Sequence, residues 1–259
     1  MKIAVGGKGG VGKTFIAGGL AAYFAGSGRR VIAIDADASP NLALTLGLSA
    51  DEASRIIPIA ENKDLIQVKT GTGYSGVFRL TFTVDDIIGR YAVPTPAGVN
   101  LLVMGTVKSM GGGCTCPAHS VVKALMRHLV VERDEIVILD MEAGIEHVGR
   151  GTAEHVDTLL VVSDANKRSL DVAATICRLA KESDIPRIGL VGNRVSDPRH
   201  ETAIRDFAGK YDLPVIALIP FDQVIADAGI SGEPIEPSSS VALQAIGDLA
   251  RNLEGNFNE

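Results

Sequence analysis

A glycine-rich stretch near the start of the chain, GGKGGVGKT at residues 6–14, constrains the fold more than any other feature of the sequence. It follows a short apolar run at 2–5 and precedes small and apolar residues at helical spacing over 14–28. Gly7 to Thr14 fit the pattern G-x-x-x-x-G-K-[ST], whose glycines let backbone N–H groups surround phosphates. The dipole of a following helix favours an anion at the same place. The sequence therefore predicts a strand, a phosphate loop and a helix, in that order.

The phosphate loop predicts the first binding residues. We expect Lys13 to reach the outer phosphates of a nucleotide, and the Thr14 hydroxyl to bind Mg²⁺. A glycine turn with an incidental Lys-Thr pair is the alternative, and the flanking strand and helix argue against it. The expected nucleotide contacts within the loop are Gly9, Gly10, Val11, Gly12, Lys13, Thr14 and Phe15.

Beyond the loop, apolar runs alternate with segments of helical spacing. Strands that are apolar on both faces and separated by helices indicate a mostly parallel sheet with helices on both faces. Right-handed crossovers then give a doubly wound α/β fold. No repeat or linker is visible, so we expect a single domain over 1–259, with variable loops in the less regular segment 50–98. The expected strands are 2–5, 29–37, 99–105, 135–140, 157–164, 187–193 and 213–220, and the expected helices are 14–28, 117–132, 167–182, 199–209 and 240–254.

Two aspartates lie where expected strands end, the edge at which ligands bind in sheets of this type. Asp37 lies nearest the end of the run RRVIAIDAD, and Asp35 before it is interpreted as a structural residue. Asp140 ends another apolar run, where a carboxylate can hold a Mg²⁺-bound water. Gly144 completes a D-x-x-x-G pattern whose glycine amide would sense a terminal phosphate. A lone strand-end Asp is often a cap, but two beside a phosphate loop favour metal-linked roles.

The stretch GGGCTCPAH at 111–119 holds two of the three cysteines. One residue between Cys114 and Cys116 lets both thiolates bind a common metal, and a closed zinc site takes four ligands. A homodimer that meets at this loop would supply two thiolates from each chain, and four thiolates suit Zn²⁺ or Ni²⁺. The alternative is two small buried apolar residues. His119 is a weaker candidate ligand, and Cys177 is expected in the core.

The phosphate loop has a second lysine, Lys8, and its K-G-G-x-G-K-[ST] form resembles the deviant loop of the MinD/ParA/NifH class of ATPases. The resemblance implies a homodimer that encloses nucleotide, with Lys8 crossing to the partner's site in the manner of an arginine finger. It also implies that Asp37 belongs to the first switch, near Mg²⁺ and the attacking water. The expected catalytic residues are thus Lys8, Lys13 and Asp37.

The same resemblance bears on the base. Asn193 offers a donor and an acceptor to a purine edge, although such a residue is also common in turns. In MinD-like proteins an Asn-Arg pair at this place holds adenine, which implies contacts from Asn193 and Arg194 and favours ATP. Pro220 and Phe221 resemble the loop that closes over the base. Phe15 departs from the Thr or Ser of many relatives and would leave only a backbone contact to the α-phosphate.

The stretches CTCPAHS, DMEAGIEHVGRGT and SDANKRSLD together resemble the CooC family of nickel-insertion ATPases and the related AcsF proteins. This implies ATP-driven dimerisation and delivery of nickel to apo carbon monoxide dehydrogenase or acetyl-CoA synthase. One alternative is a MinD/ParA-like positioning or partitioning ATPase, but the acidic tail lacks a basic amphipathic pattern. Another is a NifH-like iron–sulfur reductase, but no cysteine occurs after Asp140 until Cys177.

Composition narrows the environment and the partners. The net charge of −6 disfavours nonspecific binding of nucleic acid, and no apolar run is long enough to span a membrane. Three cysteines without a secretory signal favour a reducing compartment. We therefore expect a cytoplasmic protein with neither nucleic acid nor membrane as a partner.

Overall fold

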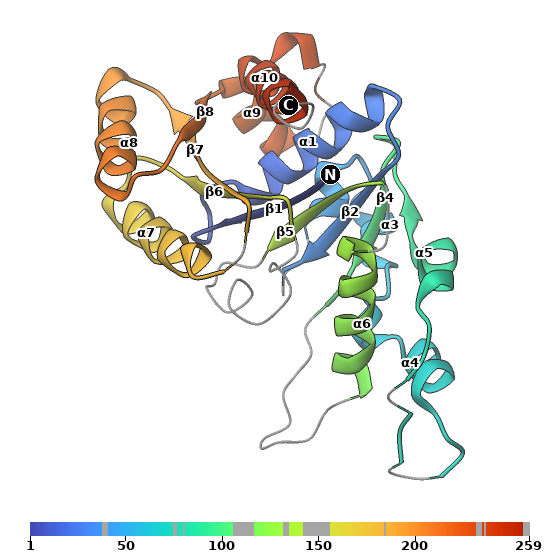
Figure 1. Ribbon diagram of the computed structural model, residues 1–259. Coiled ribbons are helices and arrows are strands. Elements are labelled where there is room, and N and C mark those ends of the chain that lie inside the picture. The colour runs from blue at the N-terminus through green and yellow to red at the C-terminus, as the bar shows by residue number, and fades with distance from the viewer. Residues whose placement is uncertain are drawn as a thin grey trace.

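The computed structural model describes residues 1–37, 41–74, 77–79, 81–105, 117–131, 135–141, 156–183, 185–231, 235 and 237–255. Its centre is an eight-stranded sheet in the order β3-β4-β2-β5-β1-β6-β7-β8 (Figure 1). Every neighbouring pair is parallel except β3 and β4. The strands are β1 (Lys2–Gly7), β2 (Val31–Ala36), β3 (Val93–Pro94), β4 (Asn100–Val103), β5 (Ile136–Met141), β6 (Thr158–Ser163), β7 (Arg187–Val195) and β8 (Val215–Pro220).

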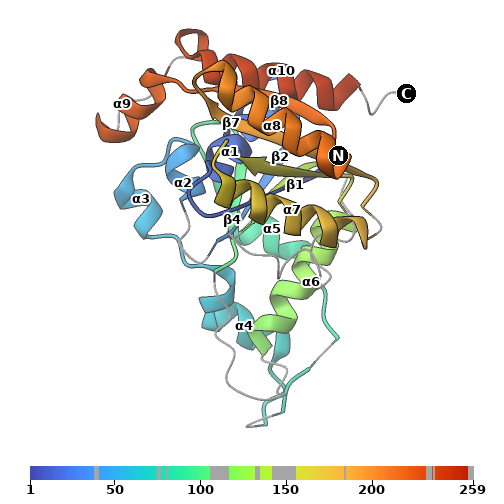
Figure 2. The same ribbon diagram turned by 90° about the vertical axis from the view of Figure 1, so that its left-hand side faces the viewer.

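Helices cover both faces of this sheet, as the two views show (Figures 1 and 2). One core joins the sheet to α1 and α10, and a second core joins the opposite face to α6, α7 and α8. The helices are α1 (Lys13–Gly26), α2 (Leu42–Thr45), α3 (Ala50–Ser54), α4 (Lys63–Thr70), α5 (Asp85–Tyr91), α6 (Pro117–Val131), α7 (Lys167–Lys181), α8 (Pro198–Tyr211), α9 (Gln223–Ser231) and α10 (Val241–Gly255), with short 3-10 turns η1 (Ile59–Glu61) and η3 (Pro237–Ser239).

Strand alternation assigns side chains to the two cores. In β1, Ile3 and Val5 belong to the α1 side, whereas Ala4 between them belongs to the other core. In β5, Ile136 and Ile138 likewise lie on the α1 side. Because successive side chains of a strand point to opposite faces, later residues of the same parity share that side. The expected doubly wound, mostly parallel α/β fold is confirmed.

The expectation of variable loops over 50–98 is wrong. This segment contains α3, η1, α4, α5 and the edge strand β3. Its helices are short and are set by local capping: Ser49 and Glu52 form a reciprocal capping box on α3, and Asn62 caps α4 by accepting from the N–H of Leu65. Of these elements, α4 and α5 project together with α6 from one side of the sheet (Figures 1 and 2). Among the described residues, no helix is both long and apolar enough to cross a membrane.

Candidate functional site

The phosphate loop connects β1, near the middle of the sheet, to the start of α1. Gly12 immediately precedes the helix with a φ of 94°, a left-handed conformation that favours glycine. A Cβ atom there would lie 2.3 Å from Nδ2 of Asn193, so the position has no room for a side chain. No side chain caps the first turn of α1 within the described residues, and no acidic residue lies in it. Its N–H groups are therefore left for an anion, and the contacts expected between this loop and a nucleotide stay a prediction.

Lys13 is the first residue of α1, and only 5% of it is exposed. Its Nζ donates to the Lys8 carbonyl at 3.4 Å, and it forms no ion pair with any residue that the structure describes. The same carbonyl accepts from the Val11 N–H at 3.5 Å, which curls the loop. A buried ammonium with one long hydrogen bond is well suited to bind a phosphate. The Lys8 side chain is half-buried, and its role across a dimer stays a prediction.

Asp35 and Asp140 occupy paired positions on the neighbouring strands β2 and β5. By alternation both side chains lie on the α1 side of the sheet, and both are almost fully buried. Asp35 accepts from the N–H of Leu42 at 2.9 Å and from the N–H of Asp37 at 3.1 Å. Burial raises the pKa of Asp35 despite these bonds. Asp35 thus holds the segment after β2, which supports its structural interpretation, while Asp37 is half-buried just beyond the strand.

Asp140 differs from Asp35 because neither of its carboxylate oxygens receives a hydrogen bond of ordinary length from the residues that the structure describes. Burial raises its pKa from 3.8 to about 7; the nearby Thr14 hydroxyl and Lys13 lower it without saturating the carboxylate, and Asp35 raises it further. A buried carboxylate without partners is costly, and a cation would satisfy it. Asp140 and Thr14 therefore fit a Mg²⁺ ion at the phosphate loop, with oxygen donors of the type that Mg²⁺ prefers.

Asn193 links the end of β7 to the phosphate loop. Its Nδ2 donates to the Val11 carbonyl at 2.7 Å, and its Oδ1 accepts from the Arg194 N–H at 2.9 Å. The residue is 4% exposed, so both ends of its amide are engaged within the protein. The structure thus gives Asn193 a bracing function that the sequence did not suggest. The expected contact of Asn193 with adenine stays a prediction.

Next to this brace, a cleft of about 320 Å³ opens beyond the ends of β6 and β7. Arg194, with a left-handed φ of 55°, contributes its wall from β7. Carboxylate, amide, guanidinium and imidazole groups together can bind a polar ligand through hydrogen bonds. The residues that line the cleft are Asp164, Ala165, Asn166, Arg194 and His200.

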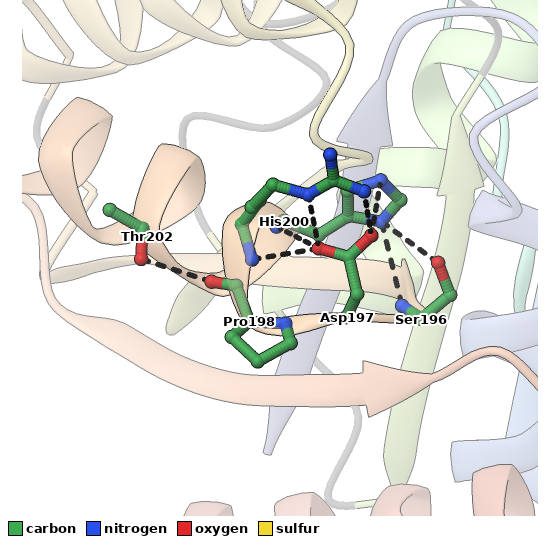
Figure 3. A network of polar contacts seen from close by, with 6 residues as sticks. Ser196, Asp197, Pro198, His200 and Thr202 are labelled. Carbon is green, nitrogen blue, oxygen red and sulfur yellow. Dashed lines mark hydrogen bonds and ion pairs between the residues drawn. The ribbon is translucent and has the colours of Figure 1, made fainter.

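The start of α8 positions His200 at this cleft. The Asp197 carboxylate accepts from the backbone N–H groups of Arg199 at 2.7 Å and His200 at 3.3 Å, the hydrogen bonds of an N-cap (Figure 3). The Arg199 guanidinium also donates to the Asp197 carboxylate at 3.2 Å, and this hydrogen bond lowers the pKa of Asp197. Ser196 Oγ lies 3.2 Å from His200 Nδ1. His200 Nε2 lies 3.8 Å from the Asp197 carboxylate, so both ring nitrogens have a polar neighbour.

The segment after β8 carries two residues expected near the base. The Phe221 N–H donates to the Val195 carbonyl at 3.0 Å, which ties this segment to the end of β7, and 48% of Phe221 is exposed. Asp222 accepts from Ser240 Oγ at 2.6 Å and from the Ala242 N–H at 3.1 Å, and the bond from Ser240 lowers its pKa. Asp222 therefore fixes the start of α10 beside the segment that holds Pro220 and Phe221.

Three predicted site residues, Gly144, Cys114 and Cys116, lie outside the described residues. Among the described residues, no cluster of three or more His, Cys, Asp and Glu side chains could hold a metal. His119 is exposed on α6. Cys177 is 2% exposed within the core, as expected, and burial raises its pKa to about 11.

Sequence reasoning missed the cleft residues Asp164, Asn166 and His200, and the bracing Asp222. A signal existed for some of them. Asn166 caps α7 by accepting from the Arg168 N–H, and an Asn just before a helix is a common cap. Asp197 followed by proline is equally typical of a helix start. No local pattern indicates that Asp222 reaches Ser240.

Residues 2–235 match the model of the CobQ/CobB/MinD/ParA nucleotide binding domain. The chain is 45% identical over 243 residues to the carbon monoxide dehydrogenase accessory protein CooC of Rhodospirillum rubrum, covering 92% of this chain and 91% of that protein. It is 39% identical over 245 residues to an uncharacterised ATP-binding protein of Methanocaldococcus jannaschii, covering 93% of each.

Solved structures share the fold. The MinC:MinD cell division protein complex of Aquifex aeolicus matches with a TM-score of 0.70 at 24% identity, over 98% of this chain and 95% of that chain. MinD of Pyrococcus horikoshii, solved with Mg-ADP, matches with a TM-score of 0.66 at 22% identity, over 98% of this chain and 96% of that chain. At these identities the match supports the fold alone.

Proposed function

The chain belongs to the CobQ/CobB/MinD/ParA family of nucleotide-binding proteins and, within it, to the CooC-type ATPases, and on this basis we propose that it is a nickel-inserting accessory ATPase for carbon monoxide dehydrogenase. It is an ATPase of the MinD/ParA class. The proposal adds that the whole chain works as one ATPase domain, that it dimerises around ATP, and that it delivers nickel to apo carbon monoxide dehydrogenase or to the related acetyl-CoA synthase.

The observation that carries this proposal is the 45% identity to an accessory protein of carbon monoxide dehydrogenase over nine-tenths of both chains. The pair Cys114 and Cys116 supports nickel as the cargo, because thiolates suit Ni²⁺ and Zn²⁺ alike. Two thiolates per chain fall short of a four-ligand site. A site shared between two chains would complete it.

The ATP site requires Mg²⁺, and Thr14 and Asp140 are the residues that would hold it. Mg²⁺ would neutralise charge that develops on the transferred phosphoryl group. Lys13 would hold the outer phosphates, and the N-terminal turn of α1 would donate backbone hydrogen bonds to them. Asp37, just beyond β2, would orient the attacking water. The cleft beside Arg194 is a suitable place for the base and ribose of the nucleotide.

Dimerisation is proposed from Lys8. Its side chain is half-buried within a loop that lies at the carboxyl edge of the sheet, and its carbonyl already serves Lys13. A lysine whose backbone is fixed in this way can extend its ammonium toward a facing nucleotide. Its charge would then stabilise the phosphoryl group of the partner's ATP, as arginine fingers do.

The experiment that tests the proposal measures metal stoichiometry and delivery together. Anaerobically purified protein is dialysed against Ni²⁺ or Zn²⁺, with and without ATP, and its oligomeric state is measured. We expect one metal per dimer, loss of binding in the Cys114→Ser/Cys116→Ser variant, and normal binding in Cys177→Ala as the matched loss of a thiol. The loaded parent, incubated with apo carbon monoxide dehydrogenase and ATP, should restore its activity.

The other outcomes separate the competing functions. One metal per monomer, or unchanged affinity in the double cysteine variant, would contradict a bridging site. A protein that binds no metal but still dimerises with ATP would favour a MinD-like positioning ATPase. A brown iron–sulfur chromophore would favour a reductase.

A further inference from the structure

Helix α6 has an unusual charge pattern on its exposed face. The exposed residues His119, Lys123 and Arg127 follow each other at intervals of four, so they form a single stripe, here called the α6 stripe. The opposite face, including Val121 and Leu125, is buried in the core. The exposed side of the helix is therefore uniformly basic, in a chain whose net charge is −6.

This arrangement opposes the stability of the helix itself. Like charges four residues apart destabilise a helix slightly, so the helix itself gains nothing from placing Lys123 four residues before Arg127. The first turn of α6 contains no acidic residue, and the sequence PAHSVVKALMRHLVV contains none at any position. Lys123 and Arg127 form no ion pair or hydrogen bond with any residue that the structure describes. The acidic neighbour that faces α6, Asp85 of α5, lies 3.5 Å from His128, so Lys123 and Arg127 are left to meet a partner from outside the chain.

The position of α6 indicates what the stripe binds. Pro117, its first residue, directly follows Cys116, and the helix lies on the outside of the molecule beside α4 (Figures 1 and 2). Val68 on α4 and Tyr74 just after it are 70% and 77% exposed. Exposed aromatic and aliphatic side chains are typical of protein interfaces, and here they lie on or just after an element that packs beside α6.

We propose that the α6 stripe docks the acidic rim of a vacant metal site on the client protein. A site that awaits a divalent cation is built from deprotonated, anionic ligands, and its charge is unbalanced until the metal arrives. A basic surface that begins three residues after Cys116 in the sequence attracts that rim, orients the donor and offsets the repulsion from an acidic chain. Once the client holds its metal, the attraction falls and the donor is released.

This inference rests on the proposed client, and its test keeps the two apart. Association with nickel-free carbon monoxide dehydrogenase is measured by surface binding for the parent, for Lys123→Glu/Arg127→Glu, and for Arg178→Glu/Lys210→Glu. The last variant makes the same charge change at exposed positions on α7 and α8. The ATPase activity of each variant shows that it folds. A fourth variant, Tyr74→Ser, tests whether the exposed aromatic residue just after α4 takes part in the contact.

At about 50 mM salt we expect the stripe variant to associate about tenfold more slowly, and the control within about twofold of the parent. The difference should shrink at about 500 mM salt, where screening is short-ranged. The parent should also prefer the nickel-free client over the loaded one, and the stripe variant should lose this preference. Tyr74→Ser should speed dissociation while leaving association unchanged.

Equal binding by the stripe and control variants would overturn the docking surface and leave the proposed function intact. A parent that fails to bind the nickel-free enzyme would overturn the client and, with it, this inference. A parent that binds a DNA duplex of about 30 base pairs, and loses that binding in the stripe variant, would identify nucleic acid as the occupant and overturn it too.

Discussion

Replacing Asp140 by asparagine should stabilise the nucleotide-free protein while removing its response to Mg-ATP. Asp140 is 1% exposed, its oxygens receive no hydrogen bond of ordinary length from the described part of the chain, and burial raises its pKa from 3.8 to about 7. At 1.36 kcal/mol per pH unit, this difference corresponds to about 4 kcal/mol of instability once the group is ionised. Asparagine has the same shape without the charge, so it removes the larger part of that cost.

The pH dependence follows from the direction of the shift. Between about pH 4 and pH 7 the folded protein holds a proton on Asp140 that the unfolded chain has released, so stability falls as pH rises through this window. Above the pKa of Asp140 in the folded protein, the stability that its proton contributes is fully lost. The gain in the free energy of unfolding from Asp140→Asn should therefore be greatest at about pH 8. We expect roughly 2–4 kcal/mol there, because the buried asparagine amide also costs some stability. At about pH 5 the gain should be less than half as large.

The assay is urea unfolding of both proteins with a metal chelator at these two pH values, followed by the same titration with Mg-ATP. ATP at about 100 times its dissociation constant should stabilise the parent by about 2.7 kcal/mol and the variant by far less. Asp206→Asn, an exposed position on α8, is the control and should change little. An asparagine variant that is less stable than the parent at about pH 8, or whose advantage is independent of pH, would refute the reasoning.

Three further predictions concern the phosphate loop. Lys13→Ala should abolish ATP binding, whereas Asp37→Ala should bind ATP yet hydrolyse it more than about 100-fold more slowly; near-parental turnover in both would contradict these assignments. Lys8→Ala should bind nucleotide but fail to dimerise with ATP in light scattering, and mixing it with Lys13→Ala should partly restore hydrolysis. Asn193→Ala should lower the free energy of unfolding in urea by about 1–3 kcal/mol, because it leaves the Val11 carbonyl without its donor. Gly12→Ala should be less harmful in the Asn193→Ala protein than in the parent, because Asn193 Nδ2 blocks a Cβ at position 12. Strictly additive effects would argue against that contact.

The sequence predicted the sheet because each central strand is apolar on both faces. Such a continuous apolar run can be recognised without knowing which strands lie beside it. The expected strands at 135–140 and 157–164 differ from β5 and β6 by a residue at either end. Segment 50–98 was misjudged because its helices are short and only weakly periodic. Ser49 and Glu52, three residues apart, were the local signal that indicated a helix start there.

The candidate site was predicted unevenly for a related reason. Lys13 and Thr14 belong to a contiguous motif, so their proximity is local. The pairing of Asp35 with Asp140 depends on the strand order, which brings β2 beside β5, and no local pattern reveals that order. The bond from Asn193 to the Val11 carbonyl is equally hidden, because it depends on the tertiary fold.

That bond joins atoms 182 positions apart in the chain, and it affects how the protein is made. β1 emerges first from a ribosome, but its neighbours β5 and β6 and the end of β7 come much later. At about 5–20 residues per second, roughly 10–40 s separate the synthesis of Val11 from that of its brace. A nascent chain that already carries its cysteines thus has no braced phosphate loop. We therefore expect nucleotide to be captured only after most of the polypeptide exists, because the brace that orders the phosphate loop is absent before then.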